Sequence, residues 1–323
     1  MKLTRIKNFR TGDSIKGFYQ LTQMNRRTTR KGDAFLDCVL SDKTGSVSAK
    51  WWNVPEAAFD WLNPGIVVAV TGEVEEYNDA RQLVVEQITP AKEGQVEKFG
   101  WAFSDIVPST TYDPDQMWEK VQEIIDSFEE EHLQKLVRRI YHDFEEEIAT
   151  HPGSVSHHHL YRGGFLEHVW SLTQLGEFVA DHYFELDRDL FLAGLFLHDI
   201  GKLLEIKSDF ERQYTDEGQF IGHIVLGRDL VRETVEDYFP EFPDDLLIRL
   251  EHVILAHQEE PAMGSPKRPA TLEALAVAML DRFDTRMEQF LMTLRNDTNT
   301  GEWTLPTRLF PYPLHKGVGD DEE

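Results

Sequence analysis

Histidine and aspartate residues recur at intervals in the C-terminal two thirds of this chain, each within apolar residues at helical spacing. They are His168, the adjacent pair His198-Asp199, His223, His252 with His257, and Asp281. Burying one ionisable group costs several kcal/mol unless it is paired or bound to a metal. A single histidine on an apolar face is usually a hydrogen-bonded core residue, but this many together are hard to explain that way. Helical bundles build two-metal sites from inward-facing imidazoles and carboxylates, so the pattern predicts a metal site.

A site of this composition suits the hydrolysis of phosphodiesters. Bound metal ions generate hydroxide near neutral pH and neutralise the phosphate oxygens that otherwise repel the nucleophile. Imidazole and carboxylate ligands without thiolate suit Mn, Fe, Co, Ni or Zn better than Mg or Ca. The chain has one cysteine, Cys38, which excludes both an internal disulfide and a thiolate metal cluster.

The order of these residues resembles the H…HD…D signature of the HD superfamily of metal-dependent phosphohydrolases. The match rests on His168 in GGFLEH, on His198-Asp199 in HDIGK, and on Asp281 in the segment LD. His223, with His252 or His257, resembles the additional histidines of members that bind two ions. The resemblance implies one ion held by His168, His198, Asp199 and Asp281, and a second completed by His223 and one or both of His252 and His257, with Asp199 bridging.

Helix geometry limits the choice between His252 and His257. Side chains five residues apart on a regular helix point about 140° apart, so both rings reach one ion easily only if the helix ends near His257. We favour His257, because it resembles the family position better. The same geometry places Asp284 on roughly the face of Asp281, where it either orients a metal ligand or pairs with a neighbouring arginine.

Other residues near the predicted site have two interpretations each. Lys202 lies one turn past His198 and either contacts a substrate phosphate, as a catalytic residue beside Asp199, or complements a helix C-terminus. His158 and His159 precede the first predicted ligand and either touch the nucleotide or form a solvated histidine run.

The elements that position these residues form two groups. Beyond residue 113 apolar residues keep helical spacing, and the last five helices are predicted near 165–183, 187–204, 218–237, 243–258 and 271–294. Residues 13–90 instead predict the order strand–strand–strand–helix–strand–strand, which is that of an OB-fold barrel. The fold class is therefore multidomain, with a small all-β OB-fold barrel followed by an all-α HD-domain helical bundle. The predicted limits are 1–92 for the barrel, 93–112 for a linker, 113–316 for the helical domain and 317–323 for an acidic disordered tail.

The loop between the first two predicted strands is basic. Its basic residues are Arg26, Arg27, Arg30 and Lys31. In OB-folds this loop flanks the oligonucleotide-binding face, so it either binds nucleic acid or is a solvated hairpin. Trp51, Trp52 and Phe35 on the predicted strands either stack on bases or belong to the barrel core.

Charge is distributed unevenly along the chain. The formal net charge is −25, but residues 1–100 contain 14 Lys+Arg and 13 Asp+Glu, so the remaining residues carry a net charge of −26. A polyanion would therefore dock on the N-terminal part. No apolar run approaches the ~20 residues that span a bilayer, and the first residues lack the apolar stretch of a signal peptide. The sequence predicts a cytoplasmic protein with no membrane partner.

An OB-fold, a linker and an HD domain in this order resemble the YhaM-type 3′-to-5′ exoribonucleases of bacteria over nearly the whole chain. Further matching motifs are GHI at His223, HVILAH at 252–257 and DRFDTRM at 281–287. The resemblance implies a metal-dependent enzyme, with Mn favoured, that shortens single-stranded RNA or DNA from the 3′ end. Where that family usually reads His-His-Gly, this chain reads His257-Gln258-Glu259.

Two other functions stay open at this point. The same HD site could hydrolyse mononucleotides or cyclic nucleotides, which would leave the barrel without a role. Alternatively, the chain could be a non-catalytic nucleic-acid-binding protein with a vestigial metal site, for which the altered residues after His257 are the argument. The sequence is also compatible with a homo-oligomer.

Overall fold

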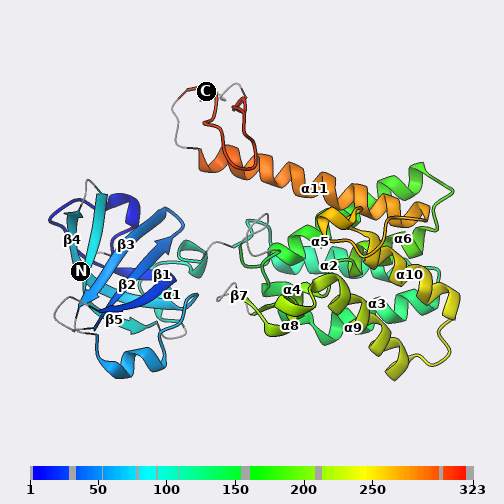
Figure 1. The fold of residues 1–323 in the computed structure, drawn as a ribbon, viewed down its shortest axis with the longest axis horizontal. Coiled ribbons are helices and arrows are strands. Elements are labelled where there is room, and N and C mark those ends of the chain that lie inside the picture. Colours follow the sequence, from blue (N-terminus) through cyan, green and yellow to red (C-terminus); the bar gives the residue numbers. More distant parts are fainter. Residues whose placement is uncertain are drawn as a thin grey trace. The chain divides into compact units, whose positions relative to one another are not determined.

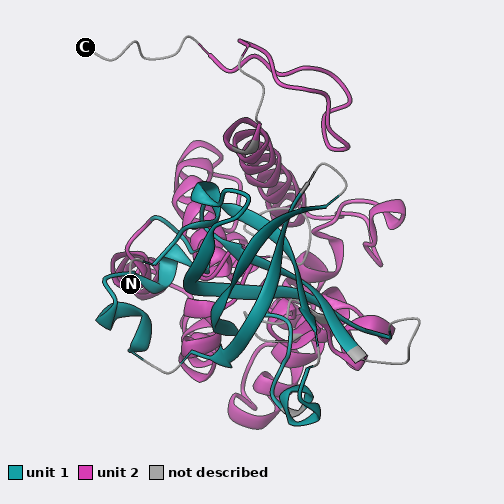
Figure 2. Cartoon of the chain, turned by 90° about the vertical axis from the view of Figure 1, so that its left-hand side faces the viewer, with its two compact units in different colours: residues 1–111, 207–213 teal, residues 112–206, 214–323 magenta. Residues whose placement is uncertain are grey.

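The computed structural model describes residues 3–28, 34–52, 54–77, 80–91, 94–107, 109–153, 161–207, 213–297 and 301–317. The chain divides into two compact units (Figure 2). Unit 1 comprises residues 1–111 and 207–213, and unit 2 comprises residues 112–206 and 214–323. None of the described helices combines the length and the apolar character needed to cross a bilayer.

Unit 1 contains a closed barrel with the strand order β1-β2-β3-β5-β4 (Figure 1). The strands are β1 (Ser14–Thr28), β2 (Ala34–Asp42), β3 (Gly45–Trp52), β4 (Val67–Tyr77) and β5 (Ala80–Pro90). Neighbouring strands are antiparallel except β3 and β5, whose parallel pairing closes the barrel. The helical piece predicted between the third and fourth strands is a 3₁₀ turn, η2 (Glu56–Asp60). The predicted OB-fold is therefore confirmed.

The barrel core follows from the alternation of residues along each strand. In β4, Val68, Val70 and Val74 point inward and are buried, while Ala69, Thr71 and Glu73, which alternate with the inward-facing positions, are less buried. Gly72 lies where the pairing of β4 with β5 shifts register, and a Cβ atom there would collide with the carbonyl oxygen of Val84. Glycine at this position lets the two strands approach closely enough to keep the barrel closed.

Short elements flank the barrel: η1 (Ile6–Asn8), α1 (Gln95–Lys98) and η3 (Phe103–Asp105). Trp101, Ile106 and Val107 form a small apolar core with Phe18 of β1. The described part of the predicted linker thus packs in unit 1, while the predicted domain limits themselves remain predictions.

Unit 2 is a helical bundle. Its elements are α2 (Pro114–Asp126), α3 (Glu131–Asp143), α4 (Glu145–Thr150), α5 (Gly164–His182), α6 (Arg188–Leu197), α7 (Lys202–Glu205), α8 (Asp216–Phe220), α9 (His223–Tyr238), α10 (Asp244–Ala256), η4 (Pro261–Met263) and α11 (Leu272–Asn296). The short strands β6 (Ile206–Lys207) and β7 (Gln213–Tyr214) form a two-stranded sheet whose residues are divided between the two units. α6 is the central helix, because it packs against α3, α5, α10 and α11. Its sequence is apolar all round, as expected of a helix buried on every side. The predicted all-α helical domain is confirmed.

Two helices predicted as continuous are interrupted. The helix predicted at 187–204 ends with α6 at Leu197, and α7 begins only at Lys202. The helix predicted at 218–237 is split into α8 and α9 at Gly222, whose φ of 83° no regular helix contains. The apolar pattern runs through both breaks, so hydrophobic periodicity does not detect them. Both breaks border residues of the predicted metal site.

Candidate metal centre

His198 and Asp199 lie at the buried end of α6. Every residue from Asp189 to Leu197 is buried, so the helix carries the pair into the interior of unit 2. His198 is 0% exposed and Asp199 is 2% exposed. A carboxylate at this depth needs cationic partners to offset its lost hydration.

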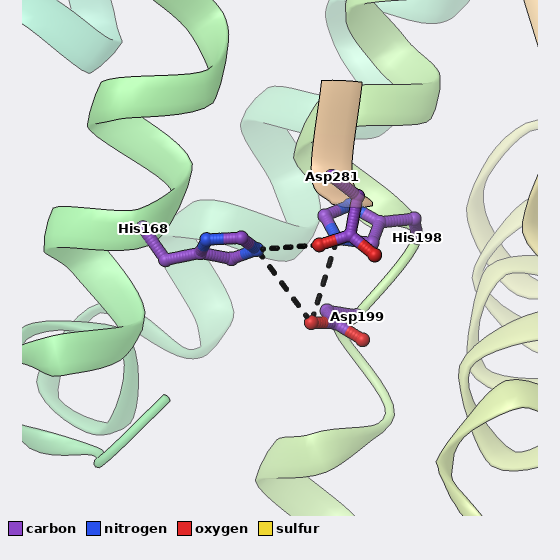
Figure 3. Close-up of side chains that lie close together, drawn as sticks. All are labelled: His168, His198, Asp199 and Asp281. Atoms are coloured by element: carbon purple, nitrogen blue, oxygen red, sulfur yellow. Dashed lines mark ion pairs between the residues drawn. The ribbon is translucent and has the colours of Figure 1, made fainter. Parts of the chain in front are cut away.

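His168 and Asp281 meet this pair from two other helices, as Figure 3 shows. His168 lies on α5 and Asp281 on α11. Nε2 of His168 is 3.3 Å from Oδ1 of Asp281 and 3.8 Å from Oδ2 of Asp199. Nε2 of His198 is 3.4 Å from the same Oδ2 of Asp199. One ligand atom from each of the four residues lies within 4.8 Å of the others, so the structure brings the four together.

A second group shares Asp199 and adds His223 and His257. His223 is the first residue of α9, and His257 directly follows the last residue of α10. Their Nε2 atoms lie 3.5 Å and 3.6 Å from Oδ1 of Asp199. Asp199 therefore turns Oδ2 to the first group and Oδ1 to the second, as a carboxylate between two cations would.

Gly201 allows the second group to form. A Cβ atom at this position would overlap the carbonyl oxygen of His223 and the backbone nitrogen of Gly227. Because glycine lacks that atom, the start of α7 lies directly against the start of α9, two helices that pack together. This backbone contact brings His223 within reach of Asp199.

Two of the histidines are oriented by backbone carbonyls. Nδ1 of His198 lies 3.0 Å from the carbonyl oxygen of Leu195, and Nδ1 of His257 lies 2.7 Å from that of Ile254. A carbonyl oxygen only accepts, so each Nδ1 carries the proton and donates it. The lone pair of each ring is then on Nε2, which faces Asp199.

The other two histidines are oriented by carboxylates. Nδ1 of His168 lies 2.9 Å from Oδ2 of Asp284, whose other oxygen accepts a hydrogen bond from Ser171 at 2.6 Å. Nδ1 of His223 lies 3.2 Å from Glu205. Carboxylates that hold the outer nitrogen of a histidine in this way are typical of metal sites.

The atoms that face each other across both groups fit a divalent metal. Among the described residues, Nε2 of His198, His223 and His257 and Oδ1 of Asp199 are buried and have no hydrogen-bond partner. Buried polar atoms without partners cost free energy, so such a cluster requires an explanation. Cations bound between these atoms would satisfy all of them. The mixed imidazole and carboxylate donors fit a divalent transition metal.

Asp199 also has a buried cation beside it. Nζ of Lys202, a residue that is 7% exposed, donates to Oδ2 of Asp199 at 2.5 Å. Burial alone would raise the pKa of Asp199, but the charges of Lys202 and His198 hold it well below its usual range. The pKa of Lys202 is raised, because its attraction to Asp199 exceeds the effect of burial. Asp199 is therefore ionised in the metal-free protein.

The pKa values of two ligand histidines move in opposite directions. Burial lowers the pKa of His257 and keeps its ring neutral, the form that binds metal. Burial also acts to lower the pKa of His168, but hydrogen bonds to Asp281 and Asp284 outweigh it and raise the pKa to about 9.

A pocket of about 1150 Å³ includes residues of both groups in its walls. Among them are Lys202, His223, His257 and Asp281. The loop 258–266 and the α11 residues Arg282 and Arg286 form another part of its walls. This volume is at the upper end of small-molecule sites, so more than one nucleotide could be accommodated.

Some predicted site residues lie elsewhere. His252 belongs to neither group: it is half-buried, and its Nε2 accepts a hydrogen bond from the backbone nitrogen of Ala270 at 2.9 Å. α10 is regular up to Ala256, so a ring five residues before His257 points to another side. His252 therefore does not lie with the other candidate ligands in the structure. His158, His159, Arg30 and Lys31 lie outside the described residues.

The two described arginines of the predicted basic loop are in a strand. Arg26 and Arg27 belong to β1, which continues to Thr28 because it pairs with β2 over its whole end. Both are exposed, and they form ion pairs with Glu56 at 2.8 Å and Asp37 at 3.0 Å. They therefore lie beside the loop rather than in it.

An exposed aromatic row lies on β2, β3 and β4. Trp51 is buried in the barrel core, whereas its neighbour Trp52 is 41% exposed and faces Phe35 with the ring centroids 4.6 Å apart. Nζ of Lys50 lies 5.0 Å from the ring centroid of Tyr77 and 5.9 Å from that of Trp52. This face of strands two and three is where OB-folds bind oligonucleotides.

Of the residues that hold the ligand histidines from behind, sequence reasoning named Asp284 but missed Glu205 and Ser171. Glu205 was not predicted, although a buried acid within the apolar segment KLLEI was a detectable signal. Ser171 has no such signal, because a serine on a helix is ordinary.

Two family models match the two units. Residues 165–286 match the HD domain, and residues 21–91 match the OB-fold nucleic acid binding domain. The first match contains all the histidines and aspartates of the two groups, and the second contains most of the barrel strands.

Curated relatives extend the similarity across the whole chain. The 3′-5′ exoribonuclease YhaM of Oceanobacillus iheyensis is 31% identical over 306 residues, which cover 94% of this chain and 93% of that protein. The protein of the same name from Listeria innocua is 29% identical over 302 residues, covering 93% and 94%. That of Geobacillus sp. is 27% identical over 318 residues, covering 97% and 96%. The chain therefore belongs to the family of YhaM 3′-5′ exoribonucleases.

Proposed function

We propose that this chain is a metal-dependent 3′-to-5′ exoribonuclease that shortens single-stranded RNA. The observation that carries the proposal is the position of Asp199, which presents each of its oxygens to a different group of imidazoles, and His223 and His257 of the second group line a large pocket. Two cations sharing one carboxylate is an arrangement that suits phosphodiester hydrolysis. Membership in the YhaM family supports the substrate and the direction of cleavage.

The two groups would hold two ions. His168, His198, Asp199 and Asp281 would bind the first, and Asp199, His223 and His257 would bind the second. When bound, such ions lower the pKa of a coordinated water and neutralise phosphate charge. Mn is the metal we favour, with Fe, Co, Ni and Zn as alternatives that the donor atoms also permit.

The remaining residues of the site prepare Asp199 and the pocket for an anionic substrate. Lys202 keeps Asp199 ionised and fixes one of its oxygens. Because Lys202 also lines the pocket, we propose that it contacts a substrate phosphate. Asp284 and Glu205 hold His168 and His223 in orientations that point Nε2 toward Asp199.

The barrel would hold the single-stranded nucleic acid. Trp52, Phe35 and Tyr77 offer rings on which bases can stack, and Lys50 lies beside two of them. Stacking accepts any base, so single-stranded DNA is also expected to bind. Arg26 and Arg27 at the end of β1 add positive charge, and Arg30 and Lys31 of the predicted basic loop stay predicted contacts to nucleic acid.

The rival functions have less support. A mononucleotide hydrolase would not need an OB-fold, and a vestigial site would not be expected to keep every ligand and its orienting partner. The cytoplasm stays the predicted place of action. Self-association into a homo-oligomer stays a prediction.

The function is tested by product lengths. Single-stranded RNA labelled at the 5′ end is incubated with the purified protein and Mn²⁺, and a second RNA carries the label at the 3′ end. We expect a descending ladder from the first and immediate release of labelled mononucleotide from the second, with no reaction in EDTA. Intact RNA in the presence of bound metal would contradict the proposal, and so would release of the 3′ label as the last product.

The ligand assignment has a matched pair of variants on one helix segment. His257→Ala removes a proposed ligand, and His252→Ala removes the histidine that lies outside both groups. We expect His257→Ala to lose at least one bound ion, measured by elemental analysis, and to lose most of its activity. His252→Ala should keep its bound ions and its activity. The reverse result would assign the second ion to His252.

A further inference from the structure

Glu259 has an unusual backbone conformation beside the metal centre. Its φ is 70°, and it is the only non-glycine residue with positive φ in the described part of the chain. This left-handed region is costly for residues with a side chain and is ordinarily occupied by glycine. It is also the position at which the chain departs from the family pattern, by reading Gln258-Glu259 after His257.

Hydrogen bonds hold the loop that contains Glu259. The backbone nitrogen of Glu259 donates to the carbonyl oxygen of Ala256 at 2.9 Å, and that of Gln258 donates to Oγ of Ser265 at 3.1 Å. Ser265 is 2% exposed, and its hydroxyl donates to the carbonyl oxygen of Leu255 at 3.2 Å. Strained backbone persists where the surroundings over-determine it, and such positions cluster at functional sites.

This loop places the Glu259 carboxylate in contact with an arginine in the pocket wall. Oε2 of Glu259 accepts a hydrogen bond from Nη1 of Arg282 at 3.0 Å. The side chain of Arg282 is 70% exposed and that of Glu259 is 30% exposed. Both residues line the pocket, and Arg282 directly follows the ligand Asp281. An ion pair this exposed is weak, so an anionic ligand can displace it.

The other two cations of the pocket wall are held differently. Lys202 is buried against Asp199. Arg286 donates to Gln289 at 3.1 Å and lies over the ring of Phe310 at 4.7 Å. Arg282, by contrast, extends into solvent with an acidic partner that a phosphate can replace. It is therefore the cation of the described pocket wall best placed to change partners.

We propose that Arg282 binds a backbone phosphate of the nucleic-acid strand and that Glu259 competes with that phosphate for the same guanidinium. Glu259 thereby sets the affinity of the pocket for substrate. A phosphodiester must displace the carboxylate before it gains the contact. This inference rests on the proposed function and assigns a substrate contact within it.

The test removes each partner and then both. Glu259→Gln keeps the shape and removes the charge, so it should lower KM for single-stranded RNA about 3-fold, an effect of the size expected for an exposed ion pair. Arg282→Ala should raise KM about 10-fold. It should also make the slope of log affinity against log salt concentration shallower by about 0.7, the value for one lost phosphate contact on a single strand. In both variants the change should fall on KM rather than on kcat.

The double variant separates competition from simple repulsion. If Glu259 acts through Arg282, adding Glu259→Gln to Arg282→Ala changes nothing further. If Glu259 only repels RNA, the same 3-fold gain appears in both backgrounds, and the proposal is overturned. Equal KM values for the wild type and Glu259→Gln would overturn it as well. Asp126→Asn and Arg138→Ala, which break an exposed ion pair that does not line the pocket, are the controls and should match the wild type.

Two further comparisons separate the effect of Glu259 on binding from its backbone strain and from catalysis. Glu259→Gly removes both the charge and the strain, so it should tighten binding as Glu259→Gln does but should also raise Tm. Binding of fluorescein-labelled single-stranded RNA with nuclease-resistant phosphorothioate linkages is measured by anisotropy in Mn²⁺ for all variants. If the wild type binds RNA but does not shorten it with Mn²⁺, and Glu259→Gln binds more tightly, the competition stands and the proposed function fails. If RNA is shortened and the variants bind equally, the function stands and the competition fails.

Discussion

Asp284 supports the metal centre without facing its interior. Its Oδ2 lies 2.9 Å from Nδ1 of His168, and its Oδ1 accepts a hydrogen bond from Ser171. A carboxylate in this position fixes the ring of the histidine and makes Nε2 a better electron-pair donor. The residue is 8% exposed, so its charge is poorly screened by water.

Asp284→Asn should weaken the binding of divalent metal about 10- to 100-fold. The amide keeps the shape of the side chain but loses the charge that holds the proton of His168 Nδ1. Calorimetric titration of the metal-free protein with Mn²⁺ measures the change. Asp143→Asn, at an exposed carboxylate paired with Arg139 on α3, is the control. Equal affinities for all three proteins would exclude an orienting role for Asp284.

Metal binding should release a proton at neutral pH. In the metal-free protein burial lowers the pKa of His168, but the contacts with Asp281 and Asp284 raise it to about 9, above the usual 6.5. The raised pKa stabilises the metal-free fold fully below about pH 6.5, and this stabilisation disappears as pH rises through 9. Metal needs the neutral ring, so affinity should increase up to tenfold per pH unit until about pH 9. Calorimetric titrations with Mn²⁺ in two buffers of different ionisation enthalpy measure the number of protons released. No proton release at pH 7.5 would contradict the prediction.

The ligand residues and one of their supports, Asp284, could be found from sequence. His168, His198, Asp199 and Asp281 stand out because charged or polar types interrupt apolar helices. Helix geometry allowed only one of His252 and His257 to reach the second ion easily, and the family resemblance favoured His257, which the structure places beside Asp199. Glu205 was overlooked although it interrupts the apolar segment KLLEI, whereas Ser171 gives no signal, because a serine on a helix is ordinary.

At the scale of elements, the turn between α6 and α7 determines the second metal group. Hydrogen bonds from Ile200 to Leu197 and from Lys202 to Asp199 make this turn tight. Gly201 within it touches the backbone of α9 at His223 and Gly227. The distance between two backbones therefore depends on one missing side chain.

Gly201→Ala should separate α7 from α9 and weaken the second metal group. The added methyl meets backbone atoms, which cannot rotate away, so we expect a loss of about 1–3 kcal/mol in the free energy of unfolding. We also expect a fall from two bound ions toward one, because His223 moves and the first group does not depend on α9. Thermal unfolding and elemental analysis check the two effects. An unchanged Tm with two ions bound would show that the turn can relax.

Element types were more predictable than element ends. The order of strands and the presence of helices follow from periodicity, because one face of each element is buried. The breaks at 198–201 and at Gly222 are set by contacts between distant segments, so no local pattern encodes them. The end of β1 is similar: its pairing with β2 keeps Arg26 and Arg27 in a strand that sequence alone placed in a loop.

At the scale of the whole molecule, most of the negative charge lies in the part of the chain that contains the candidate metal centre. The first 100 residues carry 14 Lys+Arg and 13 Asp+Glu, while the chain as a whole has a net charge of −25. The helical unit thus repels RNA at long range, and attraction must come from the barrel and from local cations. Stacking on the exposed aromatic row is the barrel contribution that salt does not screen.

Trp52→Ala should weaken the binding of single-stranded RNA by about 1–3 kcal/mol, the value of one base stacked on an aromatic ring. The effect should persist at high salt, because stacking does not depend on charge. Fluorescence anisotropy with labelled RNA measures the affinity. Trp303→Ala, at a tryptophan of similar exposure in unit 2, is the control. Equal losses in both variants would indicate a general effect of removing an aromatic surface.

The residues of the two metal groups come from α5, the turn after α6, the start of α9, the end of α10 and the middle of α11. Ions at this centre would tie together segments that are far apart in the chain, and a ligand that binds only the folded state stabilises it. Chelation should therefore lower Tm and open the helical unit to limited proteolysis, which Mn²⁺ should reverse. In a cell starved of the metal, proteases would clear the opened chain. Scarcity would then reduce the amount of this protein as well as its rate, so RNA turnover would follow the supply of a nutrient.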